Sequence, residues 1–233
     1  MIRSAGRRTR PPLYWIAQGV MGEDFPDVGE ALAEPNGLLA VGGDLSSERL
    51  LSAYRRGIFP WYSEDQPILW WSPDPRCVLF PEDLKVSRSL RATLRKDRFQ
   101  VSMDRAFRQV MAGCAGPRRG QPGTWVTPEL IEAYEHLHRL GYAHSVECWR
   151  DGRLVGGLYG VALGRVFFGE SMFAQEADAS KVCLVHLVRD LRNRDFTLID
   201  CQVSTPHLES LGAVTIPRQR FIEMLKESCG RKT

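Results

Sequence analysis

Long apolar runs are absent from this 233-residue sequence, which nowhere contains eighteen consecutive apolar residues. We therefore expect no membrane span, because a helix that crosses a bilayer needs about 20 predominantly apolar residues. The basic N-terminus carries Arg3, Arg7, Arg8 and Arg10 and then Pro11-Pro12, without the apolar stretch of a signal peptide. We expect a cytoplasmic protein.

Cysteine and histidine spacings typical of metal sites are also absent. The six cysteines have no CxxC spacing, and several lie inside apolar runs, which favours small buried thiols in a reducing cytoplasm. Among the five histidines, His136 and His138 share a predicted helix but not one face of it. The sequence therefore predicts no metal ion and no other cofactor.

The net charge is only +3 and does not by itself indicate a nucleic-acid partner. The location of the charge along the chain is more informative. One short segment contains only one acidic residue, Asp97, and six basic residues: Lys85, Arg88, Arg91, Arg95, Lys96 and Arg98. A helix starting near Ser87 would separate an apolar stripe from a basic ridge formed by Arg88, Arg91 and Arg95. Such a ridge suits a phosphate backbone, and a merely solvated helix face is the alternative.

Turns and prolines divide the chain into three parts. Residues 1–24 are predicted to form a flexible basic arm. Residues 25–75 are rich in turns and contain a helix from about Ser47 to Arg56, which indicates a small N-terminal α/β domain. The prolines at positions 73 and 75 fix an extended segment, so we place the boundary there and expect residues 76–233 to form the second domain.

The second half carries helix and strand signals in a readable order. A helix over residues 127–141 precedes three strands joined by tight turns, at residues 143–149, 153–161 and 165–173. A long helix capped by Asp178, a strand from Leu198 to Val203 and two short helices follow. This order predicts an α/β (α+β) fold, with a mixed sheet flanked by helices, in which the long crossover joins parallel strands.

The same order resembles the acyltransferase fold of the N-acetyltransferases that use acetyl-CoA. In that fold a Q/R-x-x-G-x-G/A loop between a strand and a helix binds the CoA pyrophosphate. The corresponding segment here, residues 174–181, contains no glycine, and the nearest match, residues 153–158, lies in a predicted strand. The sequence therefore disfavours acetyl-CoA and indicates a different acyl donor.

Asp200 and Gln202 introduce two polar groups into the apolar strand from Leu198 to Val203. Side chains alternate along a strand, so we expect these two to point the same way, about 7 Å apart at their Cα atoms. An unpaired buried polar group costs roughly 1–3 kcal/mol, so both need partners. The partner is either a substrate or, as the alternative, a neighbouring loop that a strand-end aspartate caps.

Eight separate segments carry a more specific resemblance: residues 34–44 (EPNGLLAVGGD), 53–61 (AYRRGIFPW), 68–76 (ILWWSPDPR), 156–159 (GGLY), 168–173 (FGESMF), 179–181 (ASK), 198–203 (LIDCQV) and 207–213 (HLESLGA). In this order and spacing they resemble the leucyl/phenylalanyl-tRNA–protein transferase family over roughly residues 25–225. The resemblance implies a small N-terminal domain and an acyl-CoA N-acyltransferase-like (GNAT-like) C-terminal domain.

The resemblance also implies an activity. The family moves leucine or phenylalanine from Leu-tRNA or Phe-tRNA to proteins that begin with Lys or Arg, and the product is a signal for the bacterial N-end-rule degradation pathway. The donor is already an activated ester, and an α-amino group has a pKa near 8, so correct placement of the two can supply most of the acceleration.

The catalytic residues expected from this chemistry are Asp200, Gln202 and Glu170. Gln202 can accept a hydrogen bond from the attacking amine through its amide oxygen, and Asp200 can orient that amide or receive the proton. Glu170 is expected at the mouth of the site, near the donor's amino group or the basic acceptor. A surface pairing with an arginine is the alternative for Glu170.

Binding residues follow from the same resemblance. Leu158, Phe167 and Met172 are candidates for the apolar pocket of the acyl side chain, with plain core packing as the alternative for Met172. The terminal adenosine is expected against four aromatic residues: Tyr54, Trp61, Trp125 and Tyr134. The basic ridge, with Lys85 beside it, is expected to contact phosphates of the tRNA acceptor stem.

Two other functions remain open. One is an N-acetyltransferase of the same fold, which the missing CoA loop disfavours and which acetyl-CoA binding would favour. The other is a non-catalytic RNA-binding module, which explains the basic ridge but leaves Glu170, Asp200 and Gln202 without a role.

Overall fold

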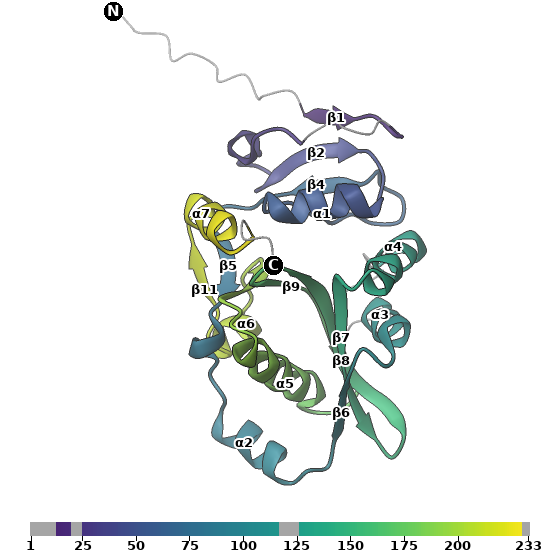
Figure 1. The fold of residues 1–233 in the computed structure, drawn as a ribbon, viewed down its shortest axis with the longest axis vertical. Helices are drawn as coiled ribbons and strands as arrows, with labels where there is room; N and C mark the ends of the chain where they lie inside the picture. The colour runs from purple at the N-terminus through teal and green to yellow at the C-terminus, as the bar shows by residue number, and fades with distance from the viewer. Residues whose placement is uncertain (1–12, 20–24, 117–125, 230–233) are drawn as a thin grey trace, which may run out of the picture.

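The computed structural model describes residues 13–19, 25–116 and 126–229. It contains a four-stranded sheet with strand order β1-β2-β4-β3 and a seven-stranded sheet with order β11-β5-β10-β9-β8-β7-β6. Figure 1 shows the smaller sheet at one end of the long axis and the larger sheet, with its helices, below it. The mixed α/β class expected from the sequence is confirmed.

The small sheet comes from the N-terminal part of the chain. Its elements are β1 (Tyr14–Ile16), the 3-10 turn η1 (Val28–Glu30), β2 (Leu38–Gly42), α1 (Ser47–Arg55), β3 (Phe59–Pro60) and β4 (Leu69–Trp71). The side chain of Ser46 accepts a hydrogen bond from the backbone N–H of Arg49 and caps α1, as predicted. Gly57, at a φ of 74°, ends the helix as expected.

The expected arm needs one correction. Within residues 1–24, Tyr14–Ile16 form β1, which pairs in parallel with Ala40–Gly42 of β2. The hydrogen-bonding edge of β2 holds this segment, and the local sequence has no turn signal that would reveal the pairing. Residues 1–12 and 20–24 of the expected arm lie outside the described residues.

The large sheet and its helices occupy the rest of the chain. Before the meander come β5 (Arg76–Leu79), the 3-10 turn η2 (Pro81–Asp83), α2 (Arg88–Arg95), β6 (Gln100–Met103), α3 (Phe107–Ala115) and α4 (Pro128–Arg139). The meander is β7 (Ala143–Arg150), β8 (Arg153–Leu163) and β9 (Val166–Ala174). After it come α5 (Ala179–Asn193), β10 (Leu198–Gln202), α6 (Pro206–Ser210), β11 (Val214–Ile216) and α7 (Arg218–Cys229).

The order predicted for the second half is confirmed. The pairs β7–β8 and β8–β9 are antiparallel, and α5 then crosses over so that β10 pairs in parallel with β9. Four elements, α3, β5, β6 and β11, were not predicted from the sequence. The boundary proposed at residue 76 falls between β4 of the small sheet and β5 of the large one, and it remains a proposal.

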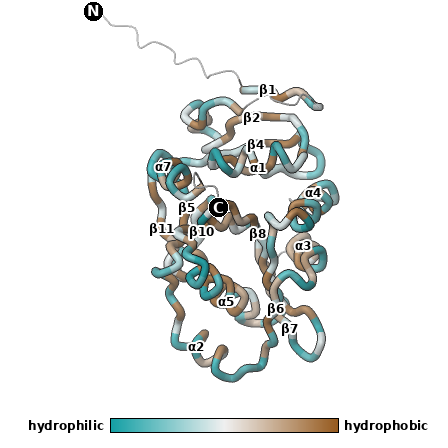
Figure 2. Tube along the Cα trace, viewed as in Figure 1, coloured by the Kyte–Doolittle hydropathy of each residue, from teal (hydrophilic) through white to brown (hydrophobic). Residues whose placement is uncertain are grey.

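Alternate residues of the large sheet face two hydrophobic cores. Val78, Phe168 and Leu198 pack in a core shared with the N-terminal sheet and α1, whereas their neighbours Leu79, Phe167 and Ile199 pack against α5. Figure 2 shows brown, hydrophobic residues along both the sheet strands and α5. The sheet is therefore covered on both faces, and a site near β9 and β10 lies between the two cores.

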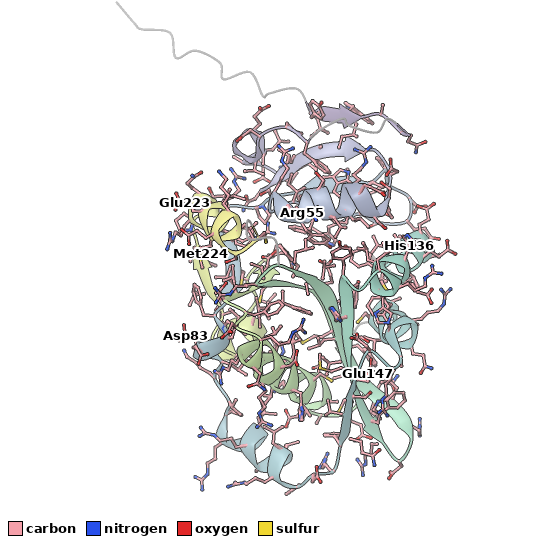
Figure 3. The ribbon with its side chains drawn as sticks, in the orientation of Figure 1. Arg55, Asp83, His136, Glu147, Glu223 and Met224 are labelled. Carbon is pink, nitrogen blue, oxygen red and sulfur yellow. The ribbon has the colours of Figure 1, made fainter. Side chains whose placement is uncertain are left out.

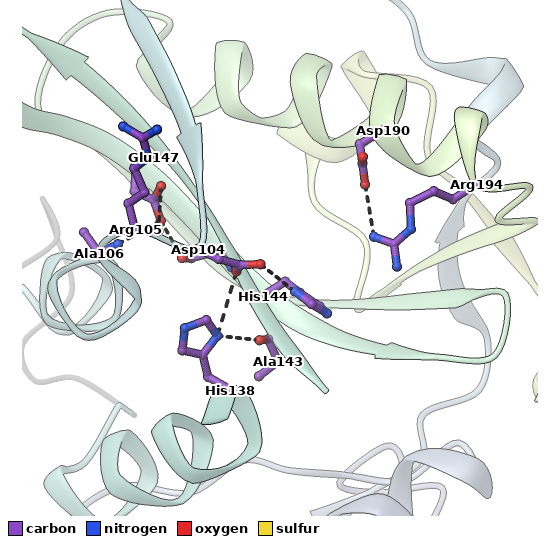
Figure 4. A network of polar contacts seen from close by, with 10 residues as sticks. Asp104, Arg105, Ala106, His138, Ala143, His144, Glu147, Asp190 and Arg194 are labelled. Atoms are coloured by element: carbon purple, nitrogen blue, oxygen red, sulfur yellow. Dashed lines mark hydrogen bonds and ion pairs between the residues drawn. The ribbon is translucent and has the colours of Figure 1, made fainter. Parts of the chain in front are cut away.

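A buried carboxylate anchors the far edge of the sheet. Glu147 on β7 is fully buried and accepts hydrogen bonds from the hydroxyls of Ser102 and Ser145 and from the backbone N–H groups of Arg105 and Ala106. Figure 4 shows the part of this network at Arg105 and Ala106, beside Asp104 and its two histidine neighbours. In Figure 3 Glu147 lies on the sheet, whereas Glu223 and His136 are at the periphery. The carboxylate thus fixes the turn between β6 and α3.

Replacing this carboxylate should destabilise the protein. Glu147→Gln puts an amide NH₂ opposite one of the two backbone N–H groups, which then has no acceptor. We expect a loss of about 2 kcal/mol of unfolding free energy, measured by urea denaturation at pH 7. The exposed residue Glu132 on α4 provides the control, since Glu132→Gln should stay within about 0.5 kcal/mol of wild type. Equal stability of both variants would contradict the anchoring role.

Candidate active site

β9 and β10 separate from each other after a short stretch of pairing, and a cavity lies where they part. Within the described residues they pair from Leu198↔Val166 to Asp200↔Phe168, whereas β9 continues to Ala174. The cavity of about 450 Å³ is lined by residues 169–172 from one strand and 201–203 from the end of the other. The parted strands therefore present side chains from both sides to one space.

Two β-bulges lie at the level where the strands part. In the β8–β9 ladder Glu170 is the extra residue, between the pairs Tyr159↔Ser171 and Gly160↔Gly169. In the β5–β10 ladder Cys201 is the extra residue, between Asp200↔Val78 and Gln202↔Cys77. A bulge interrupts the alternation of side chains and re-aims the residues around it. Here the two bulges, at Glu170 and Cys201, change which side chains face the cavity.

Gln202 lines the cavity from a strained backbone position. Its φ is 57°, in the left-handed region, and a hydrogen bond from Val203 N–H to the Cys201 carbonyl closes a tight turn around it at 2.7 Å. Such a conformation in a non-glycine residue costs of order 1–3 kcal/mol and persists where its surroundings impose it. The residue is 9% exposed, and its side-chain Nε2 has no hydrogen-bond partner among the described residues.

Asp200 occupies a different place from the one expected. It is fully buried and absent from the cavity wall, and its two carboxylate oxygens accept from Arg76 Nε at 2.8 Å and Nη2 at 2.7 Å. Asp200 Oδ1 also accepts from the backbone N–H of Gln202 at 3.0 Å. Asp200 therefore does not line the cavity beside Gln202 as expected, because the extra residue at Cys201 breaks the alternation. Of its two expected roles, orientation of Gln202 fits the hydrogen bond that Asp200 accepts from the Gln202 N–H.

Arg76, the partner of Asp200, is a residue of this site that was not predicted from the sequence. It is fully buried, donates from Nη1 to the Gly57 carbonyl at 3.1 Å, and lies between the rings of Phe59 and Phe221, with its guanidinium carbon 5.0 Å and 4.5 Å from their centroids. The available signal was a lone arginine opening the apolar run Cys77–Phe80, since a buried aspartate elsewhere needs a cation.

Glu170 lines the cavity and faces two phenols. Its carboxylate accepts from Tyr54 Oη at 2.7 Å and Tyr134 Oη at 3.5 Å, and the two hydroxyls also contact each other. No ion pair to Glu170 is present within the described residues, so the alternative of a surface arginine is not what the structure has. Burial, reinforced by the nearby Asp200 charge and opposed by the Tyr54 hydrogen bond, raises the pKa of Glu170 to about 8.

The aromatic residues expected to bind adenosine separate into two groups. Trp61 is 45% exposed and lines the cavity beside Phe59 and Pro60. Tyr54 and Tyr134 are fully buried and absent from the cavity wall, so their geometry does not suit contact with a base, and they support the Glu170 carboxyl from behind. This corrects the expectation for both tyrosines. Trp125 lies outside the described residues.

The three residues expected to form an acyl pocket all line the cavity. Leu158 and Phe167 are buried, Met172 is partly buried, and Leu184, Leu187 and Ile199 continue the same apolar surface toward α5. The cavity therefore has an apolar end beneath the sheet and a polar end at Glu170 and Gln202. An apolar group bound at the apolar end would place the reactive atoms attached to it near the polar end.

The expected basic ridge lies on α2. Arg88, Arg91 and Arg95 are exposed, as is Lys85 just before the helix. Leu90 is buried in the core between the large sheet and α5. Thr93 donates to Asp178 Oδ2 at 3.1 Å, which attaches α2 to the start of α5. Figure 1 shows α2 at the end of the large sheet that is remote from the small one. No cluster of three or more metal-ligating side chains occurs in the described part of the chain.

The mixed sheet, its parallel β9–β10 pair and the cavity between those strands define an α/β protein of the acyltransferase-like (GNAT-like) class. Two family models match the chain: "Leucyl/phenylalanyl-tRNA protein transferase" over residues 78–226 and "Leucyl/phenylalanyl-tRNA protein transferase N-terminal domain" over residues 43–74. The chain belongs to the leucyl/phenylalanyl-tRNA protein transferase family.

Curated relatives agree with this assignment. A leucyl/phenylalanyl-tRNA–protein transferase of Aromatoleum aromaticum is 65% identical over 198 residues, which cover 85% of this chain and 84% of that protein. One of Nitrosospira multiformis is 61% identical over 203 residues, which cover 87% and 88%.

Solved structures are more distant. A conserved protein of unknown function from Bacteroides thetaiotaomicron matches at a TM-score of 0.45 and 12% identity, covering 62% of this chain and 57% of its own. L-PGS from Bacillus licheniformis matches at 0.40 and 9%, covering 72% and 53%.

The raised pKa of Glu170 predicts how stability depends on pH. The folded protein keeps this proton up to a pKa of about 8, whereas the ordinary pKa of a glutamate is 4.5. Wild-type stability should therefore fall as the pH rises between these two values. The contribution of this group is up to about 1.4 kcal/mol per pH unit. Glu170→Gln does not titrate at this position. Urea unfolding from pH 4 to 9 should therefore show the unfolding free energy of the variant rising relative to that of wild type between pH 4.5 and about 8. Parallel stability curves would contradict the raised pKa.

Proposed function

We propose that this protein transfers leucine or phenylalanine from Leu-tRNA or Phe-tRNA to the N-terminal α-amino group of proteins that begin with Lys or Arg. The product would be an N-end-rule degradation signal, made in the cytoplasm, where charged tRNA is found. The observation that carries the proposal is a single cavity whose apolar end is lined by Leu158 and Phe167 and whose polar end holds Glu170 and Gln202. Family membership supports it.

The apolar end suits the two acyl side chains. Leucine and phenylalanine offer no hydrogen-bonding group, and the surface formed by Leu158, Phe167, Leu184 and Leu187 requires none. An apolar pocket separates side chains that differ by one methylene by only about 1–3 kcal/mol. Acceptance of both amino acids by one pocket is therefore the expected behaviour.

The polar end suits aminolysis of the ester. The acceptor nitrogen forms a bond to the ester carbonyl carbon, the bond from that carbon to the ribose oxygen breaks, and the amine loses a proton that the ribose oxygen finally needs. The Gln202 amide oxygen can accept a hydrogen bond from the amine and direct its lone pair. Glu170 replaces Asp200 as the proposed proton acceptor, because its pKa of about 8 is close to that of an α-amino group.

Donor binding uses two further surfaces in this proposal. The exposed ring of Trp61 at the cavity wall offers the terminal adenosine a stacking surface, worth roughly 1–3 kcal/mol. The basic ridge on α2, with Lys85, contacts phosphates of the acceptor stem without reading sequence, which fits donors with different anticodons.

Transfer of labelled leucine or phenylalanine from charged tRNA to synthetic peptides tests the proposal. Peptides beginning with Arg or Lys should accept the label, and a peptide beginning with Ala should not. Gln202→Ala should lower kcat by about 10²-fold, because the amine is no longer aimed at the ester. Gln219→Ala, an exposed glutamine on α7, is the matched control and should retain wild-type kcat. Transfer from acetyl-CoA in place of charged tRNA would favour an N-acetyltransferase.

The salt dependence of tRNA binding tests the ridge. Each lysine or arginine contact with a phosphate adds roughly 0.7–0.9 to the slope of log affinity against log salt concentration. The triple variant Arg88→Ala, Arg91→Ala, Arg95→Ala should therefore reduce that slope by about 2–3. A charge-matched control replaces three exposed arginines on other elements: Arg139, Arg153 and Arg220. An equal reduction of the slope in both triple variants would show that the ridge is not part of the tRNA-binding surface.

A further inference from the structure

Arg76 connects three parts of the chain at one buried point. Its side chain bridges Asp200 on β10, the Gly57 carbonyl after α1 and the Phe221 ring on α7. The side chains of Arg76 and Asp200 are both 0% exposed. Removing two charges from water costs several kcal/mol per ion unless the geometry is excellent and the remaining donors are satisfied. Here two parallel N–H bonds, a carbonyl and two rings meet that requirement.

The guanidinium also determines where Gln202 lies. Asp200 Oδ1 accepts from Arg76 Nε and from the backbone N–H of Gln202, at 2.8 Å and 3.0 Å. The same Gln202 is held in the left-handed region, and it is one of the residues that line the cavity. An unbroken chain of hydrogen bonds thus runs from Arg76 through the Asp200 carboxylate to the peptide group that carries the Gln202 side chain.

We propose that Arg76 is a positioning residue for the transfer reaction, which acts through Asp200 to fix the strained backbone of Gln202 and aim its amide into the cavity. The inference rests on the proposed function and adds a residue to it. Arg76 does not line the cavity, so it contacts neither substrate. Its effect is therefore on the rate of the bound complex and not on the affinity for charged tRNA.

Arg76→Lys tests this directly. Lysine keeps a positive charge between the Phe59 and Phe221 rings but lacks the planar fork that bonds both Asp200 oxygens. We expect kcat to fall by about 10²-fold, as for a misplacement of roughly 1 Å, with KM for aminoacyl-tRNA nearly unchanged. Arg218→Lys is the control, because Arg218 donates to the Ser72 carbonyl at the same junction without touching Asp200.

A double-mutant cycle separates positioning from general loss of stability. If Arg76 acts by aiming the Gln202 amide, Arg76→Lys should lower the single-turnover rate of wild type but leave that of Gln202→Ala unchanged. If Arg76 were only structural, the same fold-loss would appear in both backgrounds. That result, or wild-type kcat in Arg76→Lys, would overturn the proposal.

Phe221→Leu covers the case in which Arg76→Lys does not fold. This substitution loosens one wall of the guanidinium site and keeps both charges, so kcat should fall less than in Arg76→Lys and again only when Gln202 is present. Wild type and Arg218→Lys serve as the reference for the reaction itself. If neither wild type nor Arg218→Lys transferred the amino acid, the proposed function would be refuted. If both transferred it normally and Phe221→Leu had the kcat of wild type, the role of Arg76 would be refuted.

Discussion

The ion pair between Arg76 and Asp200 is the constraint on which the rest of this site depends. Both side chains are fully buried, and their fork-to-fork geometry joins β5 to β10 at the level where β10 leaves β9. The same guanidinium reaches Gly57 and the rings of Phe59 and Phe221. A buried pair of this kind is weak evidence for stability, but neither partner can be removed without leaving the other charge buried and unpaired. The cavity is therefore held by core contacts as well as by its own wall.

The pair also explains why the two carboxyl groups near the cavity differ. Asp200 has a cation and one further donor, the Gln202 N–H, whereas Glu170 has two phenols and burial. The Asp200 charge adds to the effect of burial on Glu170, and the Arg76 charge opposes it only in part, so the pKa of Glu170 rises to about 8. The different partners of the two carboxyl groups suit them to different tasks. One holds the backbone, and the other can exchange a proton in the range where an amine does.

The sequence was informative where a local signal decides the structure. Ser46 and Thr127 cap their helices as predicted, and the hairpin turn at Asp151-Gly152 has positive φ at both residues. The sequence was not informative where a contact between distant residues decides the position of a side chain. The bulge at Cys201 has no mark in the composition of β10, so strict alternation put Asp200 in the cavity. Arg76 and Asp200 are 124 positions apart, and nothing local connects them. Likewise the motif match brought Tyr54 and Tyr134 near the site, but only packing shows that they lie behind Glu170.

Placement and proton transfer contribute unequally to this chemistry. Ideal positioning of two reactants can be worth roughly 7–11 kcal/mol, whereas a general base typically contributes about 10²–10⁴-fold in rate. The acceptor amine is partly neutral near pH 7, since its pKa is near 8, so the demand on a base is small. A buried ion pair, the bulge at Cys201 and a left-handed backbone conformation all lie at the position of Gln202. Such strain persists only where the surrounding structure imposes it. In the proposed mechanism the position of Gln202 therefore contributes more to the rate than proton transfer, and the Glu170 carboxyl assists a reaction whose geometry is already set.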